Sequence, residues 1–136
     1  MDPKIIQPDI FIGSIRLQEP VTTITDVILG VYCIYCAIKL MSAKQNEDFY
    51  RFLIIHLFLL GLAVIIGGLL GHGFQYLFNP SWKIPGWYIS MVAVMFMERS
   101  AIAFIKEHIN HKLHQFLLII NIIELLVIMM VASWTL

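Results

Sequence analysis

Two polar residues able to do chemistry stand inside long apolar segments of this 136-residue chain. Asp26 lies about a turn and a half inside the first segment, and His72 about as far from the distal end of the second. Consecutive membrane helices run antiparallel, so both residues reach one depth on the same side of a bilayer. Each is costly to leave unpaired in hydrocarbon. We therefore predict an Asp26–His72 layer: a hydrogen bond that fixes helix register or, alternatively, a metal or proton site.

A second polar layer is predicted nearer the opposite side of the bilayer. Arg99 lies about two turns from the end of the third apolar segment, and Glu124 about two turns into the fourth. Asn121 is about one turn from Glu124, and Glu98 is rotated about 100° from Arg99. Because an unpaired charge is expensive at this depth, we predict a structural Arg99–Glu124 pair. A proton or ion path through Glu98 and Glu124 is the alternative.

Cys33 and Cys36 form a CxxC pair in the first apolar segment. Four-helix membrane thiol oxidoreductases use such a pair to pass electrons to quinone. They need the thiols near an aqueous face and commonly a second cysteine pair, whereas here both cysteines fall in mid-segment and the chain has only 2. Cysteine also serves as a small apolar residue in cores. The structural role is therefore favoured, and thiol–quinone chemistry is the alternative.

A histidine-rich run, EHINHKLH, connects the third and fourth apolar segments and contains His108, His111 and His114. On a helix, consecutive histidines at this spacing lie near one another, and Glu107 with His111 has the i, i+4 spacing of a ligand pair. The simplest interpretation of this run is a solvated loop at the membrane surface. Metal binding and a pH-responsive surface are the alternatives.

The composition sets the class of protein that must position these residues. The chain is 60% hydrophobic and 13% charged, against about 45–50% and about 25% in soluble domains. This composition is typical of an integral membrane protein, whose partners are the lipid bilayer and other membrane helices. A formal net charge of zero gives no indication of a nucleic-acid partner.

We predict an all-α polytopic membrane bundle, a single domain over residues 1–136 with four transmembrane helices. The expected spans are 21–41, 52–78, 86–105 and 116–136. Residues 1–20 mix isoleucines with charges and prolines, without the apolar core of a signal peptide, and are expected to lie at the membrane interface.

Small residues mark one side of the second span. Gly61 and Gly68 share a face with His72, and Gly67 and Gly71 form a small-xxx-small pair beside it. Small residues let helices approach closely in lipid. These glycines are therefore the predicted contact surface for partner helices.

Orientation follows from the lysines and arginines between the spans. One side would hold Lys39, Lys44, Arg51, Lys106 and Lys112, and the other Lys4, Arg16 and Lys83. The positive-inside rule places the first group in the cytoplasm and both termini outside.

The stretches EPVTTITD at 19–26 and GGLLGHGF at 67–74 resemble a family of uncharacterised bacterial seven-helix membrane proteins. That family is similar to the superfamily of alkaline ceramidases and progestin/adipoQ receptors. In ceramidase-like members, a histidine late in the second helix helps to bind zinc, with an aspartate nearby and two histidines on the last helix. The resemblance, which ends at about residue 80, implies His72 as a zinc ligand in a bacterial cytoplasmic membrane protein. Gly68 replaces a serine of those enzymes, and the last-helix histidines have no counterpart, so this chain would be the N-terminal part of a longer bundle with an incomplete zinc site.

The functional prediction is a small non-catalytic membrane protein that packs against partner helices as a subunit. The first alternative is a zinc-dependent membrane hydrolase related to ceramidases, using His72 and Asp26. The second alternative is a thiol–quinone oxidoreductase using Cys33 and Cys36.

Overall fold

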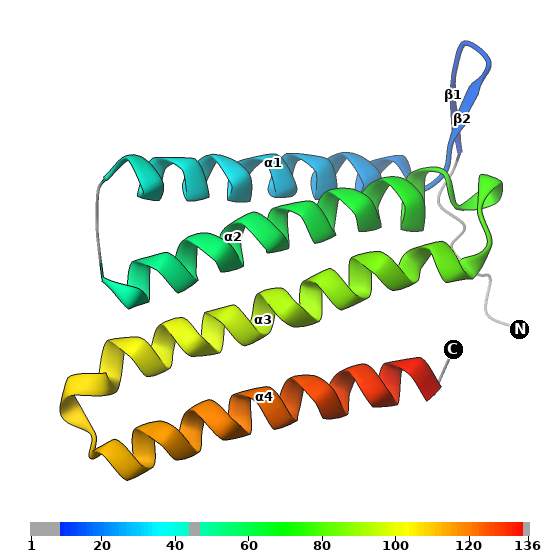
Figure 1. Cartoon of the computed structure of the whole chain (residues 1–136). Coiled ribbons are helices and arrows are strands. Elements are labelled where there is room, and N and C mark those ends of the chain that lie inside the picture. The colour runs from blue at the N-terminus through cyan, green and yellow to red at the C-terminus, as the bar shows by residue number, and fades with distance from the viewer. Residues whose placement is uncertain (1–8, 44–46, 135–136) are drawn as a thin grey trace, which may run out of the picture.

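The computed structural model describes residues 9–43 and 47–134, and four long helices dominate it (Figure 1). They are α1 (Pro20–Ser42), α2 (Asp48–Ile66), α3 (Ile84–Ile105) and α4 (His111–Trp134). With the helical turns that extend them, all four are long and apolar enough to cross a membrane. The predicted helical bundle with four candidate membrane spans is therefore confirmed, with a short β-hairpin before the first helix.

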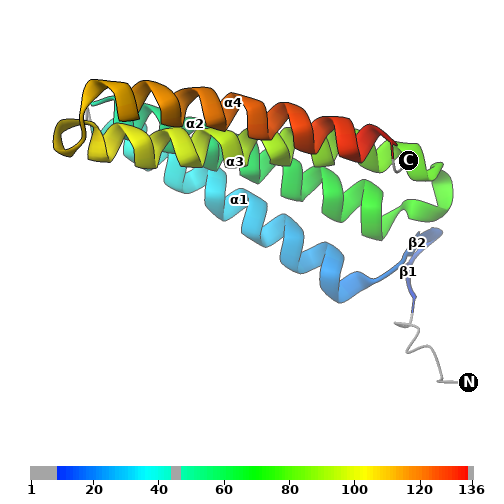
Figure 2. The same cartoon turned by 90° about the horizontal axis from the view of Figure 1, so that it is seen from below.

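The helices lie in a row in the order of the sequence, each antiparallel to the one before (Figures 1 and 2). The main helix–helix packing is between chain neighbours: α1 with α2, α2 with α3, and α3 with α4. α4 lies at one edge of the row, and its main helical neighbour is α3. Asn121 is its one buried residue among those described.

The second span does not run as one α-helix to its predicted end at residue 78. After Ile66 the chain widens into a π-helix, η1 (Gly67–Gly73), and then forms a short 3₁₀ turn, η2 (Gln75–Leu77). Four of the seven residues in GGLLGHG are glycines, which favour the α-helix least of all residues except proline. A second 3₁₀ turn, η3 (Pro80–Lys83), leads into α3, and a third, η4 (Lys106–His108), follows it.

Glycines set the close approach of α1 to α2. A Cβ atom on Gly61 would lie 2.7 Å from the carbonyl oxygen of Gly30, and one on Gly68 would lie 2.6 Å from Cβ of Asp26. Gly67 has open space around its Cβ position, and for Gly71 the nearest atoms, in the Lys83 side chain, are 4.0 Å away. The glycine surface expected to meet a partner helix is thus covered, at Gly61 and Gly68, by the protein's own first helix.

A β-hairpin precedes α1, within the segment expected at the membrane interface. Strands β1 (Ile10–Ile12) and β2 (Ile15–Leu17) pair antiparallel, with Ile12 opposite Ile15. Gly13 has a φ of 63°, the left-handed conformation that a tight turn needs and that glycine adopts without steric cost. Residues 1–8 of the predicted interfacial segment lie outside the described residues.

The basic residues are divided between the two ends of the row. Lys39, Arg51, Lys106 and Lys112 belong to the end where α1 passes to α2 and α3 to α4, and Arg16 and Lys83 belong to the other. Lys4 and Lys44 lie outside the described residues.

Candidate functional site

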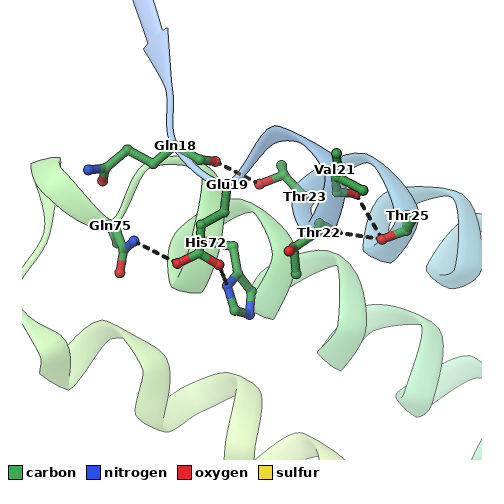
Figure 3. Close-up of polar contacts among 8 residues, drawn as sticks. All are labelled: Gln18, Glu19, Val21, Thr22, Thr23, Thr25, His72 and Gln75. Carbon is green, nitrogen blue, oxygen red and sulfur yellow. Dashed lines mark hydrogen bonds and ion pairs between the residues drawn. The ribbon is translucent and has the colours of Figure 1, made fainter. Parts of the chain in front are cut away.

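The candidate site lies where the start of α1 meets the end of the second span (Figure 3). Nδ1 of His72 is 2.7 Å from Oε2 of Glu19, and Nε2 of Gln75 donates a longer hydrogen bond of 3.4 Å to Oε1 of the same carboxylate. The side chains of His72 and Glu19 are 39% and 35% exposed. One carboxylate directly before α1 therefore holds two polar side chains at the end of the second span.

Glu19 reaches this position through an unusual backbone conformation. Its φ of 42° and ψ of 55° lie in the left-handed region, and it is the one non-glycine residue with positive φ among those described. Pro20 follows it as the first residue of α1, and the residue before a proline is normally driven to extended conformations. Strain of this kind costs about 1–3 kcal/mol and clusters at functional sites. The conformation turns the Glu19 side chain toward the second span.

The segment before α1 is held against the π-helix by its backbone. The N–H of Gln18 donates to the carbonyl of Gly73 at 3.0 Å, and Oγ1 of Thr23 donates to the carbonyl of Gln18 at 3.3 Å. A Cβ atom on Gly73 would lie 2.9 Å from Cγ2 of Thr23 and 3.0 Å from Cδ1 of Leu17. A side chain at Gly73 would force Thr23 or Leu17 to shift, so this glycine favours the close approach of the two segments beside His72.

His72 itself stands on the π-helical turn. The N–H of Phe74 donates to the carbonyl of Leu69 at 2.8 Å, the i to i−5 pattern of a π-helix. Isolated π-turns within α-helices are frequently found at functional sites. His72 meets Glu19, directly before α1, and Gly61 and Gly68, which were predicted to share its face, also lie against α1.

The predicted partner of His72 was Asp26, and the structure corrects this. The carboxylate bonded to Nδ1 of His72 belongs to Glu19, and among the described residues no hydrogen bond or ion pair involves Asp26. Asp26 packs on Gly68, about one turn before His72, and is half-buried. Neither the left-handed conformation of Glu19 nor the π-turn could be inferred from apolar periodicity, and together they decide the pairing.

In the second polar layer, Asn121 is the central residue. Its side chain, 2% exposed, accepts from Nε of Arg99 at 2.9 Å and donates to Oε2 of Glu98 at 2.7 Å and to the carbonyl of Met95 at 3.2 Å. The predicted Arg99–Glu124 pair is not among the ion pairs of the described residues. An amide supplies both a donor and an acceptor, so Asn121 bridges the oppositely charged neighbours Glu98 and Arg99. Glu124, the predicted partner of Arg99, is exposed on α4.

His56 was not among the predicted site residues. It is 8% exposed, and its Nδ1 donates to the carbonyl of Ala93 on α3 at 2.8 Å. A carbonyl can only accept, so this bond fixes the proton on Nδ1. The signal that could have found His56 is its residue type, a titratable side chain inside an uncharged apolar run. Glu19 was missed as a site residue because it stands outside the apolar segment.

The cysteine and histidine motifs do not assemble a further site in the described part of the chain. Cys33 is buried in the middle of α1, and both Cys33 and Cys36 are free thiols. His108 ends η4, whereas His111 and His114 stand in the first turn of α4. Within residues 9–43 and 47–134, no group of three or more His, Cys, Asp or Glu residues could hold a metal ion.

Residues 21–136 match a family described as "Family of unknown function (DUF6962)". No curated protein and no solved structure matches the chain. The matched region begins in the first turn of α1 and takes in all four candidate spans, together with His72, His56 and the Asn121 layer. Because the match covers most of the sequence, the chain belongs to the family of unknown function DUF6962.

Proposed function

We propose that this chain is a non-catalytic membrane protein that works as a subunit of a larger helical assembly, with α4 and the adjoining side of α3 as its contact surface. The observation that carries the proposal is the position of α4. The main packing of this helix is against α3, and Asn121 is its one buried residue among those described.

The exposed carboxylate of Glu124 supports this assignment. Glu124 lies near the middle of α4, where bilayer hydrocarbon would surround an isolated chain, and no described residue forms a hydrogen bond or ion pair with it. Ionisable residues at this depth almost always face protein or water and find a partner. A neighbouring helix with a hydrogen-bond donor would supply the partner that Glu124 does not have among the described residues.

The surface around Glu124 is also hollowed. Two recesses between α3 and α4, of about 190 Å³ and about 290 Å³, share Glu98, Asn121 and Glu124 in their linings. The rest of each lining is mainly aliphatic and methionine side chains. Helix packing in membranes depends on van der Waals contact and interhelical hydrogen bonds, and this surface offers positions for both.

The test is site-specific photo-crosslinking in the native membrane. A photoreactive amino acid replaces Ile123, which is 53% exposed on α4, and the matched control replaces Ile28, which is 63% exposed on α1. We expect discrete protein adducts at Ile123, lost in Glu124→Leu, and lipid adducts alone at Ile28. Lipid adducts alone at both positions would overturn the proposal.

A zinc-dependent hydrolase related to ceramidases is the second candidate, because one observation favours it. A histidine that binds a metal through one ring nitrogen almost always donates a hydrogen bond from the other to a carboxylate or carbonyl. Nδ1 of His72 is in contact with the Glu19 carboxylate in this way. Nε2 of His72 would then be the ligand, with Asp26 as a neighbour. Completing the site requires ligands from beyond the described residues, because these hold no three-residue metal cluster.

Metal analysis of protein purified without added chelator separates the two candidates. The hydrolase predicts stoichiometric zinc that is lost in His72→Ala and kept in His111→Ala. If wild-type protein carries no zinc and adding zinc does not raise its melting temperature, the zinc-dependent hydrolase is excluded.

A further inference from the structure

The hairpin before α1 has one aliphatic face. Because residues that pair across antiparallel strands lie on the same side, the register of the hairpin groups Ile10, Ile12, Ile15 and Leu17 on one face. Ile12 is 64% exposed and Ile15 is 54% exposed, whereas Leu17, at the base of the hairpin, is buried. Soluble surfaces seldom gather exposed aliphatic side chains in this way, so the face is suited to an apolar environment.

The hairpin extends across the direction of the helices. Figure 1 shows it beyond the start of α1, projecting sideways from the row, and Figure 2 shows it at the same end of the molecule. Spanning helices lie on average about 20° from the bilayer normal. A hairpin that projects sideways from them therefore lies along the membrane plane, at the level where α1 enters the bilayer.

Contacts at the base of the hairpin differ between its two faces. Leu17, on the aliphatic face, lies against Gly73, the last residue of the second candidate span. Arg16, on the opposite face, is bonded to Asp9, and its guanidinium lies 5.4 Å from the ring centre of Tyr76, which follows that span. Leu17 thus joins the aliphatic face to the end of the second span, and the opposite face, which carries Phe11 and Arg16, lies toward Tyr76 beyond that end.

We propose that the β1–β2 hairpin is a membrane-interface anchor that binds the bilayer surface beside α1, with Ile12 and Ile15 directed at the acyl chains. Exposed aliphatic side chains also lie at the start of α1. Val21, Ile24 and Ile28, on its first turns, are 68%, 50% and 63% exposed. Lipid that covers these side chains extends beneath the hairpin, and burial of apolar area at the headgroup boundary provides the binding energy.

The experiment measures the environment of single spin labels in lipid nanodiscs. Labels are attached in a Cys33→Ala/Cys36→Ala background to Ile12→Cys and Ile15→Cys, and to Phe11→Cys as the control on the opposite face. Collisions with oxygen, which concentrates among acyl chains, are compared with collisions with a water-soluble nickel chelate. We expect oxygen to dominate at positions 12 and 15 and the nickel chelate to dominate at position 11.

Two outcomes overturn the proposal. If collisions with the nickel chelate dominate at positions 12 and 15, the aliphatic face is in water. If both reagents collide rarely with these labels, protein covers the face.

A second measurement needs no substitution. Wild-type protein in nanodiscs containing phosphatidylcholine with a headgroup diazirine is irradiated and digested. Lipid adducts on Ile12 or Ile15 support the anchor, and adducts on α1 without any in the hairpin contradict it.

Discussion

Nδ1 of His72 lies 2.7 Å from Oε2 of Glu19, although the two residues are 53 positions apart in the sequence. The bond joins the residue that precedes α1 to a π-turn at the end of the second span. Both features are locally unfavourable, since Glu19 has a left-handed backbone and the π-turn is rich in glycine. The ion pair or hydrogen bond between them therefore contributes to holding the left-handed residue and the π-turn in place.

Substitution of either partner should show this coupling. We expect Glu19→Leu and His72→Leu each to lower the free energy of unfolding by about 1 kcal/mol, the usual contribution of one hydrogen bond. The double variant should be no worse than the worse single variant, because the first substitution already removes the bond. The measurement is thermal or denaturant unfolding of purified protein in detergent. Asp26→Leu is the control, and its effect should add to that of His72→Leu; coupling to Asp26 instead of Glu19 would contradict the observed pairing.

The crossing of α1 and α2 gives a second prediction. Gly61→Ala should destabilise the protein by about 1–3 kcal/mol, because its Cβ atom would meet the backbone oxygen of Gly30, which cannot rotate away. Gly67→Ala adds the same methyl group where no atom lies within 4 Å. It should be neutral or stabilising by up to about 1 kcal/mol, as expected when alanine replaces glycine in a helix. Equal melting temperatures for the two variants would show that α1 does not pack here.

The Asn121 layer predicts a large effect from a change without charge. Asn121→Leu removes the amide that serves Glu98 and Arg99 and leaves two charged groups without their partner between the helices. We expect a loss of about 1–3 kcal/mol or more in the free energy of unfolding. Gln115→Leu, at an exposed position on the same helix, is the control and should change stability little. Chemical denaturation in mixed micelles measures both, and a mild Asn121→Leu would mean that Glu98 and Arg99 satisfy each other directly.

Topology is tested by labelling single cysteines from either side of the membrane. Ala43 and Lys112 belong to one end of the row and Lys83 to the other. Ala43→Cys and Lys112→Cys should react with an impermeant maleimide from the same side, and Lys83→Cys from the opposite side. Labelling of Ala43→Cys and Lys83→Cys from one side would contradict four membrane crossings. The orientation that puts Ala43 in the cytoplasm is a separate prediction of the same experiment.

The class of the protein followed from the sequence, because the bilayer imposes a simple rule. A backbone in hydrocarbon must satisfy its own hydrogen bonds, so long apolar runs become helices irrespective of what they contact. Four runs predicted four helices, and α1 (Pro20–Ser42) differs by one residue at each end from the span expected at 21–41. The concentration of polar residues at two depths was also readable, because each hydrophilic side chain interrupts an otherwise uniform run.

Which of these polar residues meet was decided by the tertiary structure. Apolar periodicity assumes an undisturbed α-helix, whereas His72 stands on a π-turn, and its partner Glu19 stands outside any periodic segment. In the other layer, charge matching favoured Arg99 with Glu124, but the rotation between Glu98 and Arg99 made Asn121 the residue that both can reach. Depth in the membrane depends on position along one helix and can be counted from the sequence. Contact depends on how two helices are rotated and how closely glycines let them approach, and only the packed structure determines both.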